Sequence, residues 1–166
     1  MLHLTRPPVV ETALLIRRPA AEVCEAFVDP AITSRFWFSQ GSGRLVPGAR
    51  VRWDWEMYGA CAEVEVKAVE PGRRILIAWG SEGEAPTTVE WVFEPRSPDT
   101  TFVKVVNSGF TGDGDAQVAG VLDSLGGFTL VLAGAKAWLE HGLQLNLVPD
   151  RHPDAIVPGW RGLPAQ

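Results

Sequence analysis

The sequence is poor in the residues that build metal sites and disulfide frameworks. It has two cysteines and three histidines in 166 residues. Neither Cys24 nor Cys61 has a second cysteine or a histidine at the close spacing of a zinc site, and His3, His141 and His152 are far apart in the chain. We therefore predict no metal and no cofactor, and two reduced thiols that pack as small hydrophobic side chains.

Motifs of covalent catalysis and of phosphate binding are also missing. Ser39, Ser42 and Ser108 lie in glycine-rich turns that lack the pattern of a nucleophile elbow. The Gly-Ser-Gly run at 41–43 precedes an extended segment and lacks the Lys-Ser/Thr ending of a phosphate loop. The sequence therefore indicates no catalytic residue, and whether the protein is an enzyme stays open.

Positive charge is scarce as well. Lys and Arg total 15 against 20 Asp and Glu, a formal net charge of −5, whereas nucleic-acid binding needs a basic face. The first residues lack the pattern of a secretory signal. The apolar run from Phe128 to Leu139 is broken by Lys136 and is too short to span a bilayer. We expect no nucleic-acid or membrane partner, and a cytoplasmic location.

What the sequence does contain is strict alternation, most clearly in VRWDWEM at 51–57. Side chains of an extended strand point alternately to its two faces. Trp53, Trp55 and Met57 are therefore predicted to share one face of a strand. Two tryptophans on one face of a short strand are a large aromatic surface, which must meet a core, a ligand or a partner.

The acidic residues of the same segment resemble an acid–base pair. Asp54 and Glu56 have the parity opposite to the tryptophans, however, which places them on the outer, solvated face. Their interleaving with Arg52 favours cross-strand ion pairs, worth about 0.2–1 kcal/mol each. We predict surface pairing rather than catalysis.

Further alternating runs follow, separated by Gly, Pro, Ser and Asp turns. Strands joined by such short turns are antiparallel neighbours. Two short helices, 20–30 and 31–38, precede the runs and follow a first strand. The predicted strands are 9–17, 51–57, 61–70, 73–80, 87–95 and 100–110.

Alternation also assigns the faces of the later strands. Trp79, Trp91, Phe93 and Asn107 take the inner parity, as do the residues of the 61–70 run that end at Ala68. One face of the sheet is therefore apolar, apart from Asn107, and needs a cover.

The segment 115–140 is long enough to be that cover. A Gly126-Gly127 pair near its centre costs about 1 kcal/mol per glycine in helix propensity, which predicts close backbone packing, or a bend, where the helix crosses the sheet. The apolar residues at helical spacing, expected to face the sheet, are Val118, Val121, Leu122, Leu125, Phe128, Leu132 and Leu139.

The end of the chain has a different character. After Gly142 it is rich in proline and has no period, with Trp160 as a candidate anchor. We predict one domain, residues 1–143, followed by an irregular extension, 144–166. The extension is free either to cover a cavity mouth or to pair with a second subunit, which leaves a homodimer open.

Several local patterns resemble one family. They are RRPAAEVCEAFVDPAITSRFWF for the opening helices, LVPGARVRW for the entry to a long strand, VKAVEPGRRILIAW for a hairpin, VNSGF for a strand end, and GGFTLVLAGAKAWLEHG for the final helix. Together they span roughly residues 10–143 and are similar to the Aha1-C-like family, the homologues of the activator of heat-shock protein 90 ATPase. This family is part of the SRPBCC/START-like superfamily.

The resemblance implies an α+β helix-grip fold, in which a curved antiparallel sheet with two short helices holds a long C-terminal helix and often leaves a cavity beneath it. The inward aromatic side chains then either fill that cavity as core or line it. The candidate ligand-binding residues are Trp53, Trp55, Met57, Trp79, Trp91, Phe93, Asn107, Arg35 and Phe128.

Three functions are consistent with the resemblance. The first is binding of a hydrophobic or aromatic small molecule, because inward aromatics are clustered without a catalytic set. The second is a cyclase or hydrolase acting on a polyketide-like or ester substrate, with Asn107 and Arg35 as its polar candidates. The third is a chaperone-activating module. Co-chaperones of this name carry a separate N-terminal chaperone-binding domain, for which the chain leaves no room, so a chaperone partner is not expected.

Overall fold

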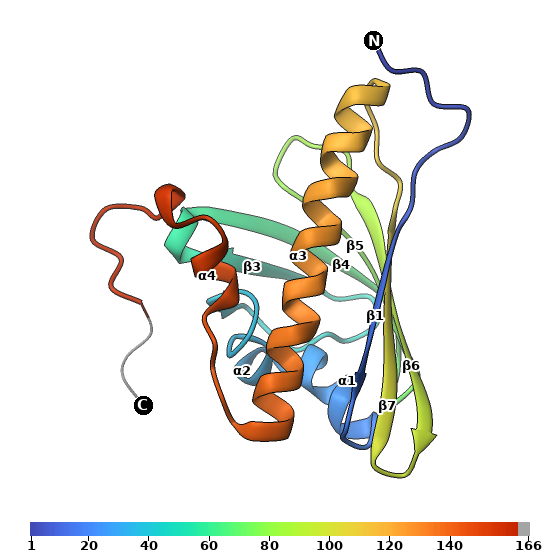
Figure 1. The fold of residues 1–166 in the computed structure, drawn as a ribbon, viewed down its shortest axis with the longest axis vertical. Helices are drawn as coiled ribbons and strands as arrows, with labels where there is room; N and C mark the ends of the chain where they lie inside the picture. The colour runs from blue at the N-terminus through green and yellow to red at the C-terminus, as the bar shows by residue number, and fades with distance from the viewer. Residues whose placement is uncertain (163–166) are drawn as a thin grey trace.

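A computed structural model describes residues 1–162 and shows a seven-stranded antiparallel sheet curved around one long helix (Figure 1). The strands are β1 (Val10–Ile16), β2 (Gln40–Gly41), β3 (Arg50–Trp55), β4 (Ala60–Glu70), β5 (Arg74–Gly80), β6 (Thr87–Ser97) and β7 (Thr100–Ser108). The helices are α1 (Ala20–Val28), α2 (Pro30–Thr33), α3 (Gly114–His141) and α4 (Leu147–Arg151), with 3-10 turns η1 (Glu56–Tyr58) and η2 (Pro153–Ala155).

The sheet has the order β1-β7-β6-β5-β4-β3-β2, and every pair is antiparallel. Strands β3 to β7 form the predicted meander. Strand β1 returns to the free edge of β7, where Thr12 lies opposite Val105. The α+β helix-grip architecture expected from the sequence is confirmed, with α3 crossing the concave face (Figure 1).

The core lies between that concave face and the helices. Ile75, Ile77 and Val89 are fully buried on the sheet, as alternation predicts. Phe27 of α1 reaches across to Trp91, with ring centroids 5.8 Å apart. At about 25 cal/mol per Å² of apolar surface, burial of this face against the helices is the main stabilising contribution.

The register departs from strict alternation at two places. A β-bulge in β4 between Val66 and Ala68 shifts the parity, so that Val69 rather than Ala68 packs against the core. The strand β3 ends at Trp55, and Met57 lies in the 3-10 turn η1 instead of on the strand. Met57 is nevertheless buried.

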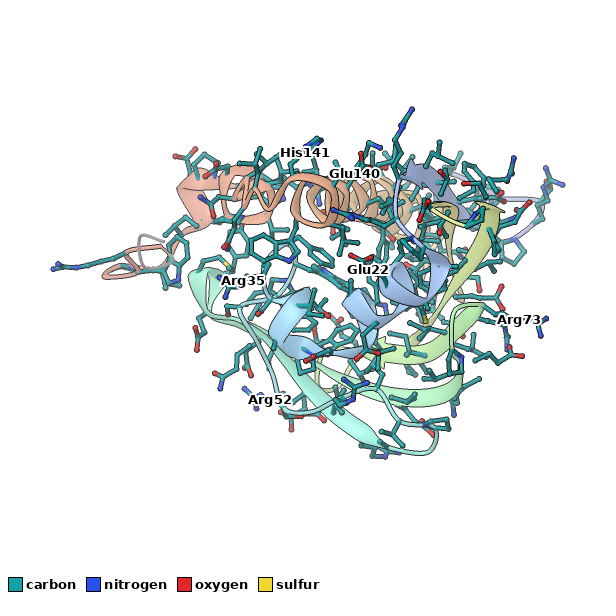
Figure 2. All side chains as sticks on the ribbon, turned by 90° about the horizontal axis from the view of Figure 1, so that it is seen from below. Glu22, Arg35, Arg52, Arg73, Glu140 and His141 are labelled. Carbon is teal, nitrogen blue, oxygen red and sulfur yellow. The ribbon has the colours of Figure 1, made fainter. Side chains whose placement is uncertain are left out.

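The outer face is charged, as predicted, and carries cross-strand ion pairs such as that of β5 with β6 at 2.6 Å, but the pairing of Arg52 differs from the expected pattern. Arg52 binds Asp54 at 2.9 Å within the same strand, and Lys67 binds Glu65 at 2.8 Å in the same way. Figure 2 shows Arg52 projecting from the side of the sheet away from α3. Asp54 is therefore a partner of a surface cation, not part of an acid–base pair.

The sheet-facing side of α3 is buried only in its C-terminal half, at Phe128, Val131, Leu132, Gly134 and Ala135. The prediction that Leu122 and Leu125 face the sheet is wrong: they are 63% and 38% exposed. By length and composition alone α3 could cross a membrane, a test that core helices of soluble proteins also pass. The helix α3 has 28 residues and is longer than the apolar run from Phe128 to Leu139.

Glu140 ties the end of α3 to β1. Its side chain accepts hydrogen bonds from Lys136 Nζ at 2.5 Å and from the Arg17 backbone N–H at 3.0 Å. Lys136 Nζ also donates to the Leu15 carbonyl oxygen at 2.8 Å. Burial alone would raise the pKa of Glu140, but these hydrogen bonds and the nearby cations outweigh it and lower the pKa.

We expect Glu140→Gln to lower the free energy of unfolding by about 1.5–3 kcal/mol at neutral pH, because two charge-assisted bonds are weakened. A lowered folded-state pKa stabilises above the unfolded-state pKa and loses that contribution as pH falls through the folded value. The gap between wild type and variant should therefore shrink between about pH 6 and pH 3. Urea denaturation at several pH values measures it, and a gap independent of pH would contradict the assignment.

Candidate functional site

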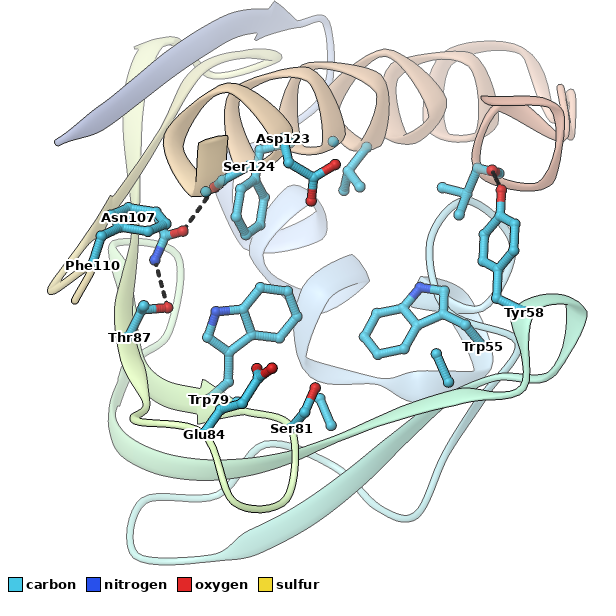
Figure 3. Close-up of a pocket in the computed structure, with 18 of the residues that line it drawn as sticks. Trp55, Tyr58, Trp79, Ser81, Glu84, Thr87, Asn107, Phe110, Asp123 and Ser124 are labelled. Atoms are coloured by element: carbon cyan, nitrogen blue, oxygen red, sulfur yellow. Dashed lines mark hydrogen bonds between the residues drawn. The ribbon is translucent and has the colours of Figure 1, made fainter. Parts of the chain in front are cut away.

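A cavity of about 740 Å³ lies between the N-terminal half of α3 and the concave face of the sheet. Figure 3 shows Trp55 and Trp79 rising from the sheet, with Asp123 projecting from α3 toward them. Exposed residues on the lining, including Glu84 and His152, mark the opening to solvent. The cavity has the size of a small-molecule site.

The cavity exists because the helix above it carries small side chains. Ala116, Gly120, Ser124 and Gly127 line the cavity and lie on one side of α3 at spacings of three and four residues. Further along the helix the larger side chains of Phe128, Val131 and Leu132 are buried and close the cavity at that end. Stepping back by four from Phe128 to Ser124 and Gly120 would have revealed this, whereas following the apolar residues led to the outer side.

Trp37, which the sequence analysis did not select, is the centre of the aromatic floor. Its ring centroid lies 4.8 Å from that of Trp53, 5.7 Å from Trp79 and 6.2 Å from Trp55. It lines the cavity while being only 7% exposed. It follows the short helix α2, where no alternation assigned it a face.

The nine candidate residues divide into three groups. Those on the cavity lining are Trp55, Trp79, Asn107 and Phe128. Those packed in the core and not on the lining are Trp53, Trp91 and Phe93. Those at a separate, small pocket near α2 and the C-terminal segment are Arg35 and Met57.

The two tryptophans of β3 thus have different surroundings. Trp53 is 1% exposed and stacks on Phe38, with centroids 4.9 Å apart and planes inclined by 24°. Trp55, at the end of the strand, lines the cavity. Arg35 does not reach the cavity, because its guanidinium lies over the ring of Trp138, 5.1 Å from the centroid.

Asn107 is the buried polar residue of the lining, at 2% exposure. Its Nδ2 donates to Thr87 Oγ1 at 3.0 Å and to the Thr88 carbonyl oxygen at 2.8 Å. Its Oδ1 accepts from Ser124 Oγ at 2.7 Å (Figure 3). One amide therefore joins β7, β6 and α3 at the deep polar end of the cavity, which the inward parity of Asn107 did not reveal.

The segment after Gly142 supplies another wall. It forms the short helix α4 where the sequence shows no period, and Val148, Arg151 and His152 line the cavity. The Tyr58 hydroxyl donates to the Val148 carbonyl oxygen (Figure 3). Burial raises the pKa of Tyr58, which keeps this phenol a neutral donor.

Arg151 fastens that wall to α3. Its Nη2 donates to the Asp123 carbonyl oxygen at 3.0 Å and lies 3.3 Å from Asp123 Oδ1. A Cβ on Gly126 would lie 2.7 Å from Nη2, and one on Gly127 would lie 3.0 Å from Nη1. The close neighbour of the two glycines is thus an arginine side chain of the C-terminal segment, not the backbone of the sheet as predicted, and the helix is not broken there.

No group of His, Cys, Asp and Glu that could hold a metal occurs within residues 1–162. The lining instead combines indole and phenyl rings, neutral hydroxyl and amide groups at the deep end, and an Asp123–Arg151 pair at the side. Such a lining suits an apolar or aromatic molecule with a small polar group.

The fold and the cavity define a START-like, helix-grip protein. The chain belongs to the family described as "Activator of Hsp90 ATPase homolog 1-like protein", whose model matches residues 17–133. The fold is that of soluble proteins, and the cytoplasmic location stays a prediction. None of the curated proteins matches the chain.

Several solved structures have the same fold. Protein SSP2350 from Staphylococcus saprophyticus is 28% identical, with a TM-score of 0.70 over 83% of this chain and 96% of that one. DynU16, from the dynemicin biosynthetic locus, is 25% identical with a TM-score of 0.72, covering 82% of this chain and 48% of that one. The Aha1 dimer from Colwellia psychrerythraea, 18% identical with a TM-score of 0.66 over 81% of this chain and 98% of that one, shares the fold.

Proposed function

We propose that the protein binds a hydrophobic or aromatic small molecule in the cavity between the sheet and α3. The observation that carries this proposal is the cavity of about 740 Å³ whose floor is made of Trp37, Trp55 and Trp79, with Phe128 above them. Large rings on the lining offer apolar area and stacking geometry. The small residues of α3 leave that area uncovered within the protein.

Pyrene is a suitable probe because its absorption overlaps tryptophan emission, so that binding is read as energy transfer. We expect saturable binding to the wild type. Trp79→Ala should weaken it about tenfold or more, since stacking of an aromatic ligand on one ring is worth about 1–3 kcal/mol. Trp138→Ala is the matched control: it removes an indole that is not on the lining and should leave the affinity unchanged.

Two outcomes would refute the proposal. One is no saturable binding of pyrene to the folded wild-type protein. The other is equal loss of affinity in Trp79→Ala and Trp138→Ala, which would place the ligand elsewhere. Circular dichroism of each variant shows whether it is folded.

The enzyme hypothesis has less support from the geometry. Its two polar candidates were Arg35 and Asn107, and Arg35 lies over Trp138, outside the cavity. Asn107 uses both its amide hydrogens within the protein. The origin of DynU16 in a biosynthetic locus keeps a polyketide-like ligand among the molecules to test.

The hypotheses of a chaperone partner and of a homodimer depend on other observations. The chaperone hypothesis is supported by the family description alone, and the outer face of β3 and β4 carries ion pairs instead of an apolar docking patch. A homodimer is consistent with exposed Leu122 and Leu125 on α3 and with the dimeric relative from Colwellia psychrerythraea.

A further inference from the structure

The polar end of the cavity has a defined donor and acceptor pattern, set by Asn107. The carbonyl oxygen of Thr88 can only accept a hydrogen bond, so the Asn107 atom 2.8 Å from it must be the amide nitrogen. The same nitrogen is 3.0 Å from Thr87 Oγ1, and Oδ1 faces Ser124 Oγ at 2.7 Å. The amide orientation is therefore fixed by chemistry, without reference to the ligand.

This orientation dictates what the two neighbouring hydroxyls can offer. Asn107 Nδ2 donates, so Thr87 Oγ1 accepts, and the Thr87 hydroxyl hydrogen remains available as a donor. Asn107 Oδ1 carries no hydrogen, so Ser124 Oγ donates to it, and the oxygen lone pairs of Ser124 remain available as acceptors. Both residues line the cavity.

We propose that Thr87 and Ser124 together bind a neutral ligand group that is both hydrogen-bond acceptor and donor, such as a phenolic or alcoholic hydroxyl or a primary amide. The three side chains at this end are an amide and two hydroxyls, and none carries a charge to balance an ion. The indole nitrogen of Trp79 is turned toward the same end and adds a second donor (Figure 3). Asn107 acts here as a positioning residue.

This inference rests on the proposed cavity ligand and adds its polar group. A series of probes with one ring system separates the two: pyrene, 1-hydroxypyrene, 1-methoxypyrene and pyrene-1-carboxylate. The hydroxyl compound can donate and accept, the methoxy compound only accepts, and the carboxylate is an anion. Affinities are measured by energy transfer from tryptophan in the wild type, in Thr87→Val, in Ser124→Ala and in the double variant.

In the wild type we expect 1-hydroxypyrene to bind about tenfold more tightly than 1-methoxypyrene, since a net hydrogen bond is worth about 0.5–1.5 kcal/mol. The carboxylate should bind more weakly than the hydroxyl compound, because its charge would be desolvated at an end with neutral side chains, while Arg151 is already paired with Asp123. The preference should fall in each single variant and vanish in the double variant. Thr88→Val, on the opposite face of β6, is the matched control and should retain it.

The outcomes distinguish the two proposals. Equal affinity for the hydroxyl and methoxy compounds in the wild type, or a preference that persists in the folded double variant, overturns the inference while leaving the cavity proposal intact. Tighter binding of the carboxylate than of the hydroxyl compound also overturns it. Failure of every pyrene to bind overturns the cavity proposal and this inference with it.

Discussion

Replacing Trp53 with alanine is expected to lower the free energy of unfolding by about 3–5 kcal/mol, the range for large aromatic deletions in a core. Trp53 is 1% exposed, stacks on Phe38 and lies 4.8 Å from Trp37 between ring centroids. The large rings packed around Trp53 cannot move to fill the space that the indole leaves. The destabilisation therefore combines lost transfer free energy with a new void.

Trp55→Ala is the matched variant, because it removes an indole that lines the cavity instead of one packed in the core. Trp55 comes from the same strand and the same face, but it borders a cavity that already exists. Its loss should cost markedly less stability and should instead weaken binding of an aromatic probe. Chemical denaturation gives the free energy of unfolding of each variant, and pyrene titration gives the affinity of each. Equal loss of stability in the two variants would show that Trp55 fills the core rather than lining a cavity.

A second large effect is expected for Asn107→Asp. The substitution places a carboxylate oxygen where the amide nitrogen lies 2.8 Å from the Thr88 carbonyl oxygen, so a donor becomes a second acceptor at a site 2% exposed. Burial of an unpaired charge with a repulsive neighbour should lower the free energy of unfolding by about 3 kcal/mol or more at neutral pH.

The pH dependence identifies the cause. Both burial and the Thr88 carbonyl disfavour the charged form, so the folded-state pKa of the new carboxyl is raised above its unfolded value. Stability should be lowest above the folded pKa and be regained as pH falls toward about 4, where the acid is protonated and can donate to Thr88. Ser108→Asp, at the neighbouring outward position of β7, is the control. An Asn107→Asp penalty independent of pH would contradict the buried-charge explanation.

The architecture could be predicted because alternation and turn residues are local signals. The faces of β3, β5, β6 and β7 follow directly from parity. The shift in β4 could not be foreseen, because a bulge depends on how a strand pairs with its neighbours. Ala68 and Val69 are both apolar, so the sequence does not indicate which of them faces the core. Met57 kept its predicted burial although it left the strand.

The site was less predictable because it is defined by what is missing from a helix face. Apolar periodicity favoured Leu122 and Leu125, but a helix over a cavity faces the sheet with Gly120 and Ser124. Trp37 lies outside any regular element, so no period could place it. Whether a tryptophan packs in the core or lines the cavity depends on contacts between segments far apart in the chain.

The arginine seated on the two glycines of α3 has a consequence for how the protein can change over time. The region that the family model matches ends at residue 133, whereas Arg151 and the wall it fastens lie beyond it. Most of the sheet and of α3 and one wall of the cavity therefore belong to different stretches of the chain. A lineage can alter that side by substitution in a terminal segment while the folding core stays the same.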